Sequence, residues 1–564
     1  MSFMWDKASG YLFYERAVFE RAAWRPHQEV LEGRLVELAS HVCVPATLRN
    51  LQVLHFNQIE VPPPLEIFGY DWPGEFTPYA AQKVTSNMLV LNPVCYVLNE
   101  MRTGKTMASL WAADFLMRQH PGLKFLILSN LSTLKDVWRV AIIRNFLGRR
   151  TCTVLHSATA DSRMKKLTAN VDFYIANHDA LRLGVTWEHK QAKSGKTHKV
   201  MRIGGLAAEL IRRGDIGGVI IDEASAFKDA TTDRSKAGRA IIAKSKYFRW
   251  PMTGSPTAQA PTDIHGLRYL TEPGYIDRFD NVRNLLMRRK TQYRWEPQKE
   301  ITVRRPDGSA ETVSAVEMAA RLLRPAVRFR AADCFDAPEQ TIVRRRAQLS
   351  DSQKAILRKL KSDALALLQH ANGDVSQVSV ANAGVMRSKS LQILSGAVYD
   401  DAGLAQKVDA RDRLNVLDEV ISETEDKIIV LAPFTSILHI LHKHLTPAKS
   451  VFIDGSTPVN ARSDLLSEFL NGDHKRFLIA NPEILKFGLD LSAASVLIWF
   501  GPVDKTETWI QANKRICGPN QTKPTLVVCL SSHALEDEVY NRLQTQENMQ
   551  DVFLKLIEDR DIYG

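Results

Sequence analysis

The sequence lacks any run that would carry it into or across a membrane. No stretch of about 18 uncharged apolar residues occurs among its 564 residues, and the opening Met1-Ser2-Phe3-Met4-Trp5-Asp6 has no basic segment followed by an apolar one. The six cysteines are scattered without a C-x-x-C pair, which argues against a zinc site or a disulfide framework and fits a reducing compartment. We therefore expect a cytoplasmic protein with free thiols and no membrane partner.

Acidic residues are too few to balance the basic ones, and the net charge is +11. Residues 186–214 hold seven Lys or Arg against two Glu, and residues 286–330 hold eleven against five acids, so these two segments carry the whole excess. Such concentration favours a polyanion, most simply nucleic acid, although solvated basic loops are the alternative. Four lysines between positions 190 and 199 recur every third residue, as contacts along one face would. The candidates are Lys190, Lys193, Lys196, Lys199, Arg304 and Arg305.

The composition is that of an ordinary globular protein, with 45% apolar residues. One stretch is the most informative about function. At residues 94–106 an apolar run, V-C-Y-V-L, predicts a buried strand and gives way to N-E-M-R-T-G-K-T. Apolar residues at helical spacing follow, so Gly104, Lys105 and Thr106 stand where a strand feeds a helix N-terminus. Backbone N–H groups there bind phosphates, a lysine can reach the β- and γ-phosphates of ATP, and a threonine can bind Mg²⁺.

The match to G-x-x-x-x-G-K-[ST] is imperfect, because Asn99 stands at the first glycine. We accept it because asparagine tolerates a positive φ angle better than most residues. Arg102 and Thr103 complete the predicted nucleotide-binding loop. A lysine in an ordinary strand-to-helix loop is the alternative.

A second buried strand, Val219-Ile220-Ile221, ends in Asp222 and Glu223. Acids at the carboxyl end of such a strand lie in the ligand crevice of an α/β sheet. Asp222 can hold Mg²⁺ through water, and Glu223 can polarise the water that attacks the γ-phosphate. Surface acids after a strand are the alternative, but together with the Lys105 loop this pair predicts an ATPase.

Two further stretches are candidates for the same site. Gln82, in F-T-P-Y-A-A-Q, lies 23 residues before Lys105 and is placed to hydrogen-bond adenine, with a helix-surface glutamine as the alternative. Thr253, Gly254 and Ser255 follow another predicted strand and are candidates to link the γ-phosphate site to a second lobe.

The alternation of strands and helices predicts an α/β fold with parallel sheets. We expect three regions: residues 1–68, mostly helical with aromatic packing; residues 69–333, the nucleotide-binding lobe with basic insertions near 186–214 and 286–330; and residues 334–564, a second α/β series. The insertion near 286–330 should contain a hairpin around the turn signal R-P-D-G at 305–308.

Taken in order, these stretches resemble superfamily 2 helicase-like ATPases, and among them the Swi/Snf-type DNA translocases. The loop 99–106 looks like the family's D-E-M-G-L-G-K-T, D-E-A-S at 222–225 its D-E-A-H, and T-G-S-P at 253–256 its T-G-T-P. Further matches are L-R-P at 323–325, I-D-G-S-T at 453–457, G-L-D-L at 488–491 and Q-A-N-K-R at 511–515. The compact form, without histone-reading modules, resembles bacterial or viral members.

The resemblance implies two tandem RecA-like lobes that share an ATP cleft, with duplex DNA across both and no need for a second protomer. It also implies roles in the second lobe: Gly488 and Asp490 near the nucleotide, Gln511 in coupling, and Arg515 as the arginine that stabilises the transition state. Three departures from the family pattern occur, the last two of them in the second half of the site. Ser225 replaces a histidine, Lys486-Phe487 replaces a glycine pair, and Gly518 stands where a second arginine is expected.

The leading interpretation is an ATP hydrolase, stimulated by nucleic acid, that translocates along duplex DNA. An RNA or single-strand helicase on the same scaffold is the second interpretation. A nucleic-acid clamp whose hydrolysis has been lost is the third, suggested by Asn99 and Gly518.

Overall fold

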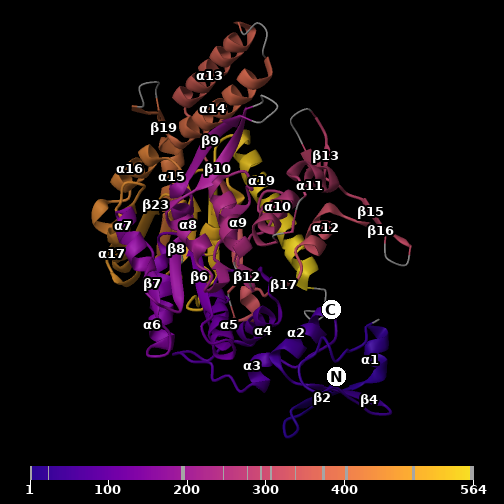
Figure 1. The fold of residues 1–564 in the computed structure, drawn as a ribbon. Helices are drawn as coiled ribbons and strands as arrows, with labels where there is room; N and C mark the ends of the chain where they lie inside the picture. The colour runs from indigo at the N-terminus through magenta and orange to yellow at the C-terminus, as the bar shows by residue number, and fades with distance from the viewer. Residues whose placement is uncertain are drawn as a thin grey trace. The chain divides into compact units, whose positions relative to one another are not determined.

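The protein is described by a computed structural model that covers residues 3–22, 24–191, 197–244, 247–272, 274–275, 277–291, 295–304, 308–336, 338–370, 375–399, 404–485 and 490–558. The chain divides into two compact units, one of residues 1–334 with 549–564 and one of residues 335–548. Each unit contains its own parallel β-sheet (Figure 1). Among the described helices, none has both the length and the apolar character that a membrane crossing needs.

The first unit is centred on a parallel sheet in the order β12-β11-β6-β8-β7. A parallel pair, β17 and β5, continues this sheet, because isolated bridges join Val94 to Arg249 and Val97 to Met252. These strands are β5 Tyr96–Val97, β6 Lys124–Ser129, β7 Cys152–Val154, β8 Phe173–Asn177, β11 Ile216–Ile221, β12 Phe248–Pro251 and β17 Ala326–Val327. Their carboxyl ends meet at one edge, where ligands bind in α/β sheets.

Both faces of this sheet are buried, which explains why its strands read as continuous apolar runs. In β6, Leu126 and Leu128 belong to one core cluster, and Phe125 and Ile127 belong to the other. The helical segments are α4 Ala80–Leu91, α5 Lys105–Gln119, η1 Leu134–Arg139, α6 Val140–Phe146, α7 Ala160–Leu167, η2 His178–Gly184, α8 Gly205–Arg212, η3 Ala224–Phe227, α9 Asp233–Lys244, η4 Pro261–Asp263, α10 Ile264–Thr271 and η5 Ala331–Asp333.

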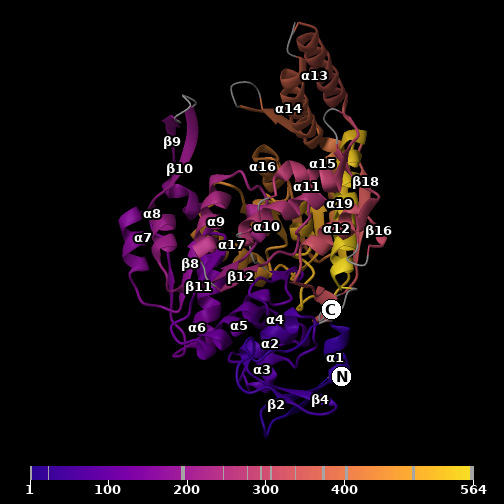
Figure 2. The same cartoon turned by 45° about the vertical axis from the view of Figure 1, so that its right-hand side comes forward.

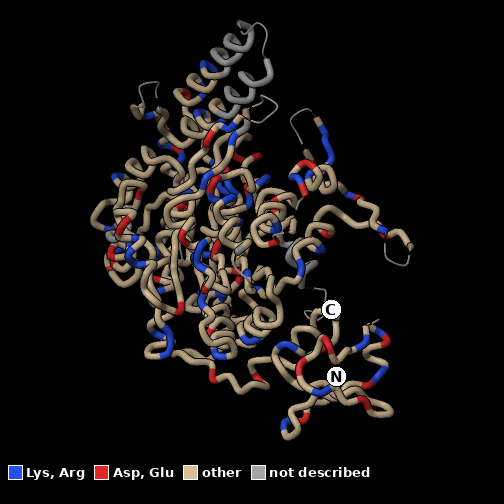
Figure 3. Tube along the Cα trace, viewed as in Figure 1, with Lys and Arg blue, Asp and Glu red and all other residues tan. Residues whose placement is uncertain are grey.

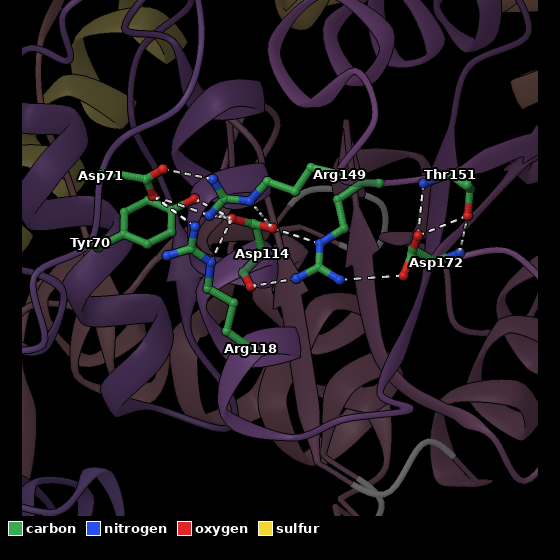
Figure 4. A network of polar contacts seen from close by, with 8 residues as sticks. Tyr70, Asp71, Asp114, Arg118, Arg149, Thr151 and Asp172 are labelled. Carbon is green, nitrogen blue, oxygen red and sulfur yellow. Dashed lines mark hydrogen bonds and ion pairs between the residues drawn. The ribbon is translucent and has the colours of Figure 1, made fainter.

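A buried carboxylate, Asp114, fixes α5 against its surroundings (Figure 4). Its side chain is fully buried and accepts hydrogen bonds from the Tyr70 hydroxyl (2.7 Å) and from Arg150 Nε (2.6 Å). Arg149 pairs with Asp114 and also with Asp71, which lies in the segment before α4. The network therefore ties the approach to the nucleotide-binding lobe to the helix that follows the predicted phosphate loop.

The N-terminal region is not mostly helical, and that prediction was wrong. Four antiparallel strands in the order β1-β2-β4-β3 form a sheet beside three short helices. Burial alternates along residues 11–14 with the two-residue period of a strand, since Leu12 and Tyr14 are fully buried on one face and Tyr11 and Phe13 are partly buried on the other. The elements are β1 Phe3–Asp6, β2 Tyr11–Glu15, α1 Arg16–Arg21, β3 Val36–Glu37, β4 His41–Pro45, α2 Leu48–Phe56 and α3 Pro64–Ile67.

Two insertions break the alternation in the first unit. One is an antiparallel hairpin of β9 Val185–Gln191 and β10 Thr197–Ile203. The other contains α11 Phe279–Leu286, β13 Met287–Arg289, β14 Trp295–Pro297, β15 Ile301–Arg304, β16 Ala310–Val313 and α12 Ala315–Leu322. The pairing of β15 with β16 confirms the predicted hairpin. Two of the three residues of β13 are arginines, Arg288 and Arg289 (Figure 3).

The second unit has a parallel sheet in the order β18-β25-β24-β21-β23-β22, and it confirms the predicted second α/β series. Its strands are β18 Gln340–Arg346, β21 Lys427–Leu431, β22 Ser450–Ile453, β23 Phe477–Ala480, β24 Ala494–Trp499 and β25 Thr525–Ser531, with a small hairpin of β19 Ala397–Tyr399 and β20 Ala405–Lys407. Its helical segments are α13 Asp351–His370, α14 Val375–Ser395, α15 Arg411–Ser422, α16 Thr435–His444, η6 Pro447–Lys449, α17 Val459–Asn471 and α18 Thr506–Asn513. Helix α19 Ala534–Glu558 begins in this unit, and its last residues belong to the first.

Candidate functional site

The predicted phosphate loop connects β5 to α5 at the carboxyl edge of the first sheet. Arg102 and Gly104 have left-handed φ angles of 70° and 76°. The φ angle favours glycine there, and a Cβ atom on Gly104 would lie 1.9 Å from Gln82 Nε2, so a larger residue would also displace the Gln82 side chain. Among the described residues no side chain caps the N-terminus of α5, which leaves the anion-binding end of its dipole to a ligand.

Lys105 lies at the start of this helix with its ammonium folded back on the loop. Its Nζ donates to the carbonyl oxygens of Asn99 and Glu100, each at 2.8 Å. Burial lowers the pKa of Lys105, while the negative charges of Glu223 and Asp222 act in the opposite direction. The fold therefore brings the predicted lysine and the predicted acidic pair into one electrostatic site.

The acidic pair stands at the end of β11, and Asp222 is held in one orientation. Its Oδ2 accepts hydrogen bonds from Ser129 Oγ (2.9 Å) and Trp138 Nε1 (3.0 Å), and its Oδ1 accepts one from the Glu223 amide (3.1 Å). Glu223 has a left-handed φ of 46°, a conformation that non-glycine residues adopt at a cost of about 1–3 kcal/mol and that clusters at functional sites. The backbone thus turns sharply at the residue predicted to polarise water.

Asn99 does not use a positive φ angle, and our reason for accepting it in the motif was wrong. Its φ is negative, and the left-handed positions in the loop are Arg102 and Gly104. The Asn99 side chain, 1% exposed, donates from Nδ2 to Thr85 Oγ1 (2.9 Å) and accepts at Oδ1 from the Phe329 amide (3.0 Å). Asn99 is therefore a bridge between α4, the loop and the segment around residue 329.

That segment, residues 325–331, runs beside the start of the loop and was not foreseen as part of the site. Arg328, 5% exposed, donates from Nη1 to the Leu98 carbonyl (3.0 Å), and the Ala331 amide donates to Glu100 Oε2 (2.7 Å). In the sequence this segment begins at the proline of L-R-P at 323–325 and contains R-F-R at 328–330. Three backbone bonds complete the contact: Tyr96 N to Pro325 O (3.0 Å), Leu98 N to Val327 O (2.8 Å) and Glu100 N to Phe329 O (2.9 Å).

Gln82 lies against the phosphate loop, as predicted, but both ends of its amide already have partners. Oε1 accepts from the Tyr79 amide at 2.9 Å, and Nε2 donates to the Gly104 carbonyl at 3.3 Å. A side-chain amide has a second N–H and a second lone pair, so these bonds leave capacity for adenine. Its role as the adenine reader stays a prediction.

The predicted coupling residues after β12 also reach the loop. The Thr253 amide donates to the Val97 carbonyl (2.9 Å), and Ser255 N donates to Thr253 Oγ1 (3.1 Å). Both side chains are almost fully buried. A Cβ on Gly254 would lie 3.5 Å from the Asn99 carbonyl, so this turn packs directly on the phosphate loop.

The remaining candidates lie in the second unit. Arg515 is 5% exposed and donates from Nε to the Leu485 carbonyl at 2.8 Å. Asp490 accepts from Ser492 N and Asn520 Nδ2, each at 3.0 Å, and Gln511 Nε2 donates to Glu507 at 3.3 Å. Gly488 lies outside the described residues. The functional roles predicted for these residues stay predictions.

The basic candidates do not share one face. Lys190 pairs across the hairpin with His198, and Lys199 pairs with His189. Because neighbouring strand residues point to opposite faces, Lys190 and Lys199 lie on opposite sides, which corrects the predicted single face. Arg304 is exposed on β15. Lys193, Lys196 and Arg305 lie outside the described residues.

Comparison with known proteins identifies two domains. The SNF2-related domain matches residues 83–397, more than half of the chain, and the Helicase conserved C-terminal domain matches residues 412–517. ATP-dependent helicase fft1 of Schizosaccharomyces pombe is 28% identical over 124 residues, which is 22% of this chain and 13% of that protein. Transcription termination factor 2 of Drosophila melanogaster is 27% identical over 167 residues, 27% and 16% of the two chains. ATP-dependent helicase FUN30 of Saccharomyces cerevisiae is 28% identical over 137 residues, 24% and 12%.

The matched segments thus span only 12 to 16% of these relatives. The similarity to the solved Sulfolobus solfataricus SWI2/SNF2 ATPase core in complex with dsDNA covers 86% of this chain and 94% of that chain, at 17% identity and with a TM-score of 0.37. The family assignment rests on the SNF2-related domain, whose match at 83–397 includes most of the first unit and the start of the second. The chain belongs to the SNF2-related family of superfamily 2 helicase-like proteins.

Proposed function

We propose that this protein hydrolyses ATP in response to nucleic acid and uses the cycle to translocate along duplex DNA. The observation that carries the proposal is Lys105: its ammonium lies at the uncapped start of α5 in the field of Asp222 and Glu223. A cation at a helix N-terminus opposite two carboxylates suits a phosphate chain on one side and a hydrolytic water on the other. Family membership and relatives named as ATP-dependent helicases support the same activity.

The residues present fit a nucleoside triphosphate with Mg²⁺. Lys105 now bonds two loop carbonyls and would exchange them for β- and γ-phosphate oxygens, with Gly104, Thr103 and Arg102 shaping the loop around them. The Thr106 hydroxyl and the fixed Asp222 carboxylate are oxygen donors of the kind Mg²⁺ prefers. Bound Mg²⁺ supplies neutralisation of the charge on the phosphate oxygens.

Glu223 would accept the proton of the attacking water, or orient that water, from its sharply turned position after β11. Arg515 is the proposed source of transition-state charge from the second unit. Its Nε donates to the Leu485 carbonyl, which holds the guanidinium in place, and the proposed role would use contacts from its Nη groups to phosphate.

Duplex DNA is the proposed partner, on the strength of the two basic insertions and the family. An exposed hairpin with lysines on both faces can contact phosphates on either side, which suits backbone binding rather than base reading. An RNA or single-strand helicase is the second candidate, and a clamp without hydrolysis is the third.

The test is ATP turnover by the purified chain with no polymer, duplex DNA, single-stranded DNA or RNA, and Lys105→Ala as the inactive control. We expect duplex DNA to stimulate most. Preferential stimulation by RNA or single strands would favour the second candidate. Nucleic-acid binding without turnover under any condition would leave only the clamp.

A further inference from the structure

The β9–β10 hairpin joins the first unit through a narrow neck made of glycine. Gly204 N donates to the Gly184 carbonyl at 2.7 Å, and a Cβ on Gly184 would lie 2.2 Å from the Gly204 carbonyl oxygen. Any larger residue at 184 would therefore force the two strands apart. Beyond this neck the hairpin projects past α8 and α9 with most of its β9 side chains exposed (Figure 2).

The first tether between hairpin and core is Trp187. Its indole N–H donates to Asp233 Oδ1 at 3.0 Å, and the Lys236 ammonium lies 4.6 Å from its ring centroid. Both partners belong to the first turn of α9. Movement of the hairpin about its neck would therefore pull on the start of that helix.

The second tether is Arg234, which lies between Asp233 and Lys236 in the first turn of α9. Its Nη1 donates to Asp179 Oδ1 (3.2 Å) in η2, the segment that leads directly into β9. Its Nη2 donates to the Ala226 carbonyl (2.6 Å) in η3, three residues after Glu223. One guanidinium thus joins the root of the hairpin to the turn that carries the acidic pair.

We propose that the β9–β10 hairpin is an arm that senses nucleic acid, and that Arg234 transmits its position to Glu223. This rests on the proposed function, because it concerns stimulation of that hydrolysis. Glu223 has a left-handed backbone conformation that the surrounding structure must enforce. Displacement of the Ala226 carbonyl would shift this turn and so change the direction of the Glu223 carboxylate. Arg234 is a positioning residue, since it acts through the backbone of η3.

The tether can be cut without unfolding the protein. The Asp179 side chain is 56% exposed and that of Arg234 is 27% exposed, and ion pairs this accessible contribute little to stability. The Arg234 contacts matter for geometry, because the planar guanidinium holds η2 and η3 at a fixed separation. Arg239, on the same helix, offers a matched control: it donates to the Tyr275 carbonyl at 2.8 Å and stacks on Tyr269, away from the acidic pair.

The experiment measures basal turnover, turnover at saturating duplex DNA, and the DNA concentration for half-stimulation in the full chain. For Arg234→Ala we expect the ratio of stimulated to basal rate to fall by about 5- to 150-fold, the usual range of coupling between sites, at an unchanged half-stimulating concentration. Arg234→Lys reaches only one partner and should be intermediate. Asp179→Asn should resemble Arg234→Ala, and the double variant should be no worse than either.

A wild-type ratio in Arg234→Ala would overturn the inference and leave the proposed function standing. An equal loss in Arg239→Ala would also overturn it, because the cause would then be general loosening of α9. Absence of stimulation in the wild type would instead remove the proposed function, and the inference with it.

Discussion

Replacing Asn99 with glycine separates what the motif predicts from what the structure predicts. The pattern G-x-x-x-x-G-K-[ST] has glycine at this position, so the motif alone predicts a neutral or improved loop. The structure predicts the opposite, because Asn99 has a negative φ and its side chain bonds Thr85 and the Phe329 amide. Asn99→Gly removes both bonds and gains nothing from glycine's freedom.

The expected cost follows from those two contacts. Leaving the Phe329 amide without its partner costs about 1–3 kcal/mol, and losing the Thr85 bond costs about 0.5–1.5 kcal/mol. Glycine adds up to about 1 kcal/mol through the greater freedom of the opened chain. Together these costs come to about 1.5–5.5 kcal/mol, which raises the population of the locally opened loop by roughly 10- to 8,000-fold.

Hydrogen exchange followed by mass spectrometry measures this opening directly at the amides of residues 96–100 and 325–331. Thr85→Val is the matched control, since it removes the acceptor of Asn99 Nδ2 and leaves the Phe329 amide bonded to Asn99 Oδ1, so its acceleration should be smaller. Peptides from the second unit should exchange at wild-type rates in both variants. Wild-type exchange at the loop in Asn99→Gly would refute the bridging role.

Further predictions concern other parts of the molecule. Asp114→Asn should destabilise the first unit by about 3–5 kcal/mol in denaturant unfolding, because Arg149 and Arg150 would lose a fully buried counter-charge. Burial lowers the pKa of His178 from 6.5 to about 4, so between these pH values the imidazole takes up a proton only in the unfolded chain. The free energy of unfolding should therefore fall by about 3 kcal/mol as the pH falls from 6.5 to 4, and His178→Gln should lack this pH dependence. Arg515→Ala should abolish stimulated turnover with unchanged ATP affinity; a dead Lys514→Ala beside an active Arg515→Ala would show the arginine assignment to be one residue out.

The sequence predicted correctly those parts of the fold whose secondary structure is determined by one strong local pattern. The buried strands before Asn99 and Asp222 are continuous apolar runs, and the hairpin at 301–313 has a turn signal between its strands, so each was recognisable without long-range information. The N-terminal sheet was missed because its aromatic residues were counted as helical packing. Residues 11–14 are Tyr-Leu-Phe-Tyr, so the alternating burial of β2 leaves no polar–apolar alternation in the sequence.

The candidate site was predictable only as far as motifs reach. Lys105, Asp222 and Glu223 each follow a predicted buried strand, and this position indicated their roles in binding phosphate, Mg²⁺ and water. The fold brings the three residues together. The bonds of residues 325–331 to the loop join positions about 230 apart in sequence, and no local pattern encodes such pairing. The same holds for the lysines of the first hairpin: their regular spacing suggested contacts along one face, and the strand pleat puts Lys190 and Lys199 on opposite faces.

The central claim is that Glu223 drives hydrolysis at a site built by Lys105 and Asp222. Phosphate release at saturating duplex DNA, measured together with ATP affinity for the wild type and Glu223→Gln, tests it most directly. We predict DNA-stimulated release by the wild type, a loss of about 100- to 10,000-fold in Glu223→Gln, and ATP affinity unchanged within about twofold, because the substitution removes the base and leaves the phosphate contacts. Release by Glu223→Gln at the wild-type rate would contradict the account.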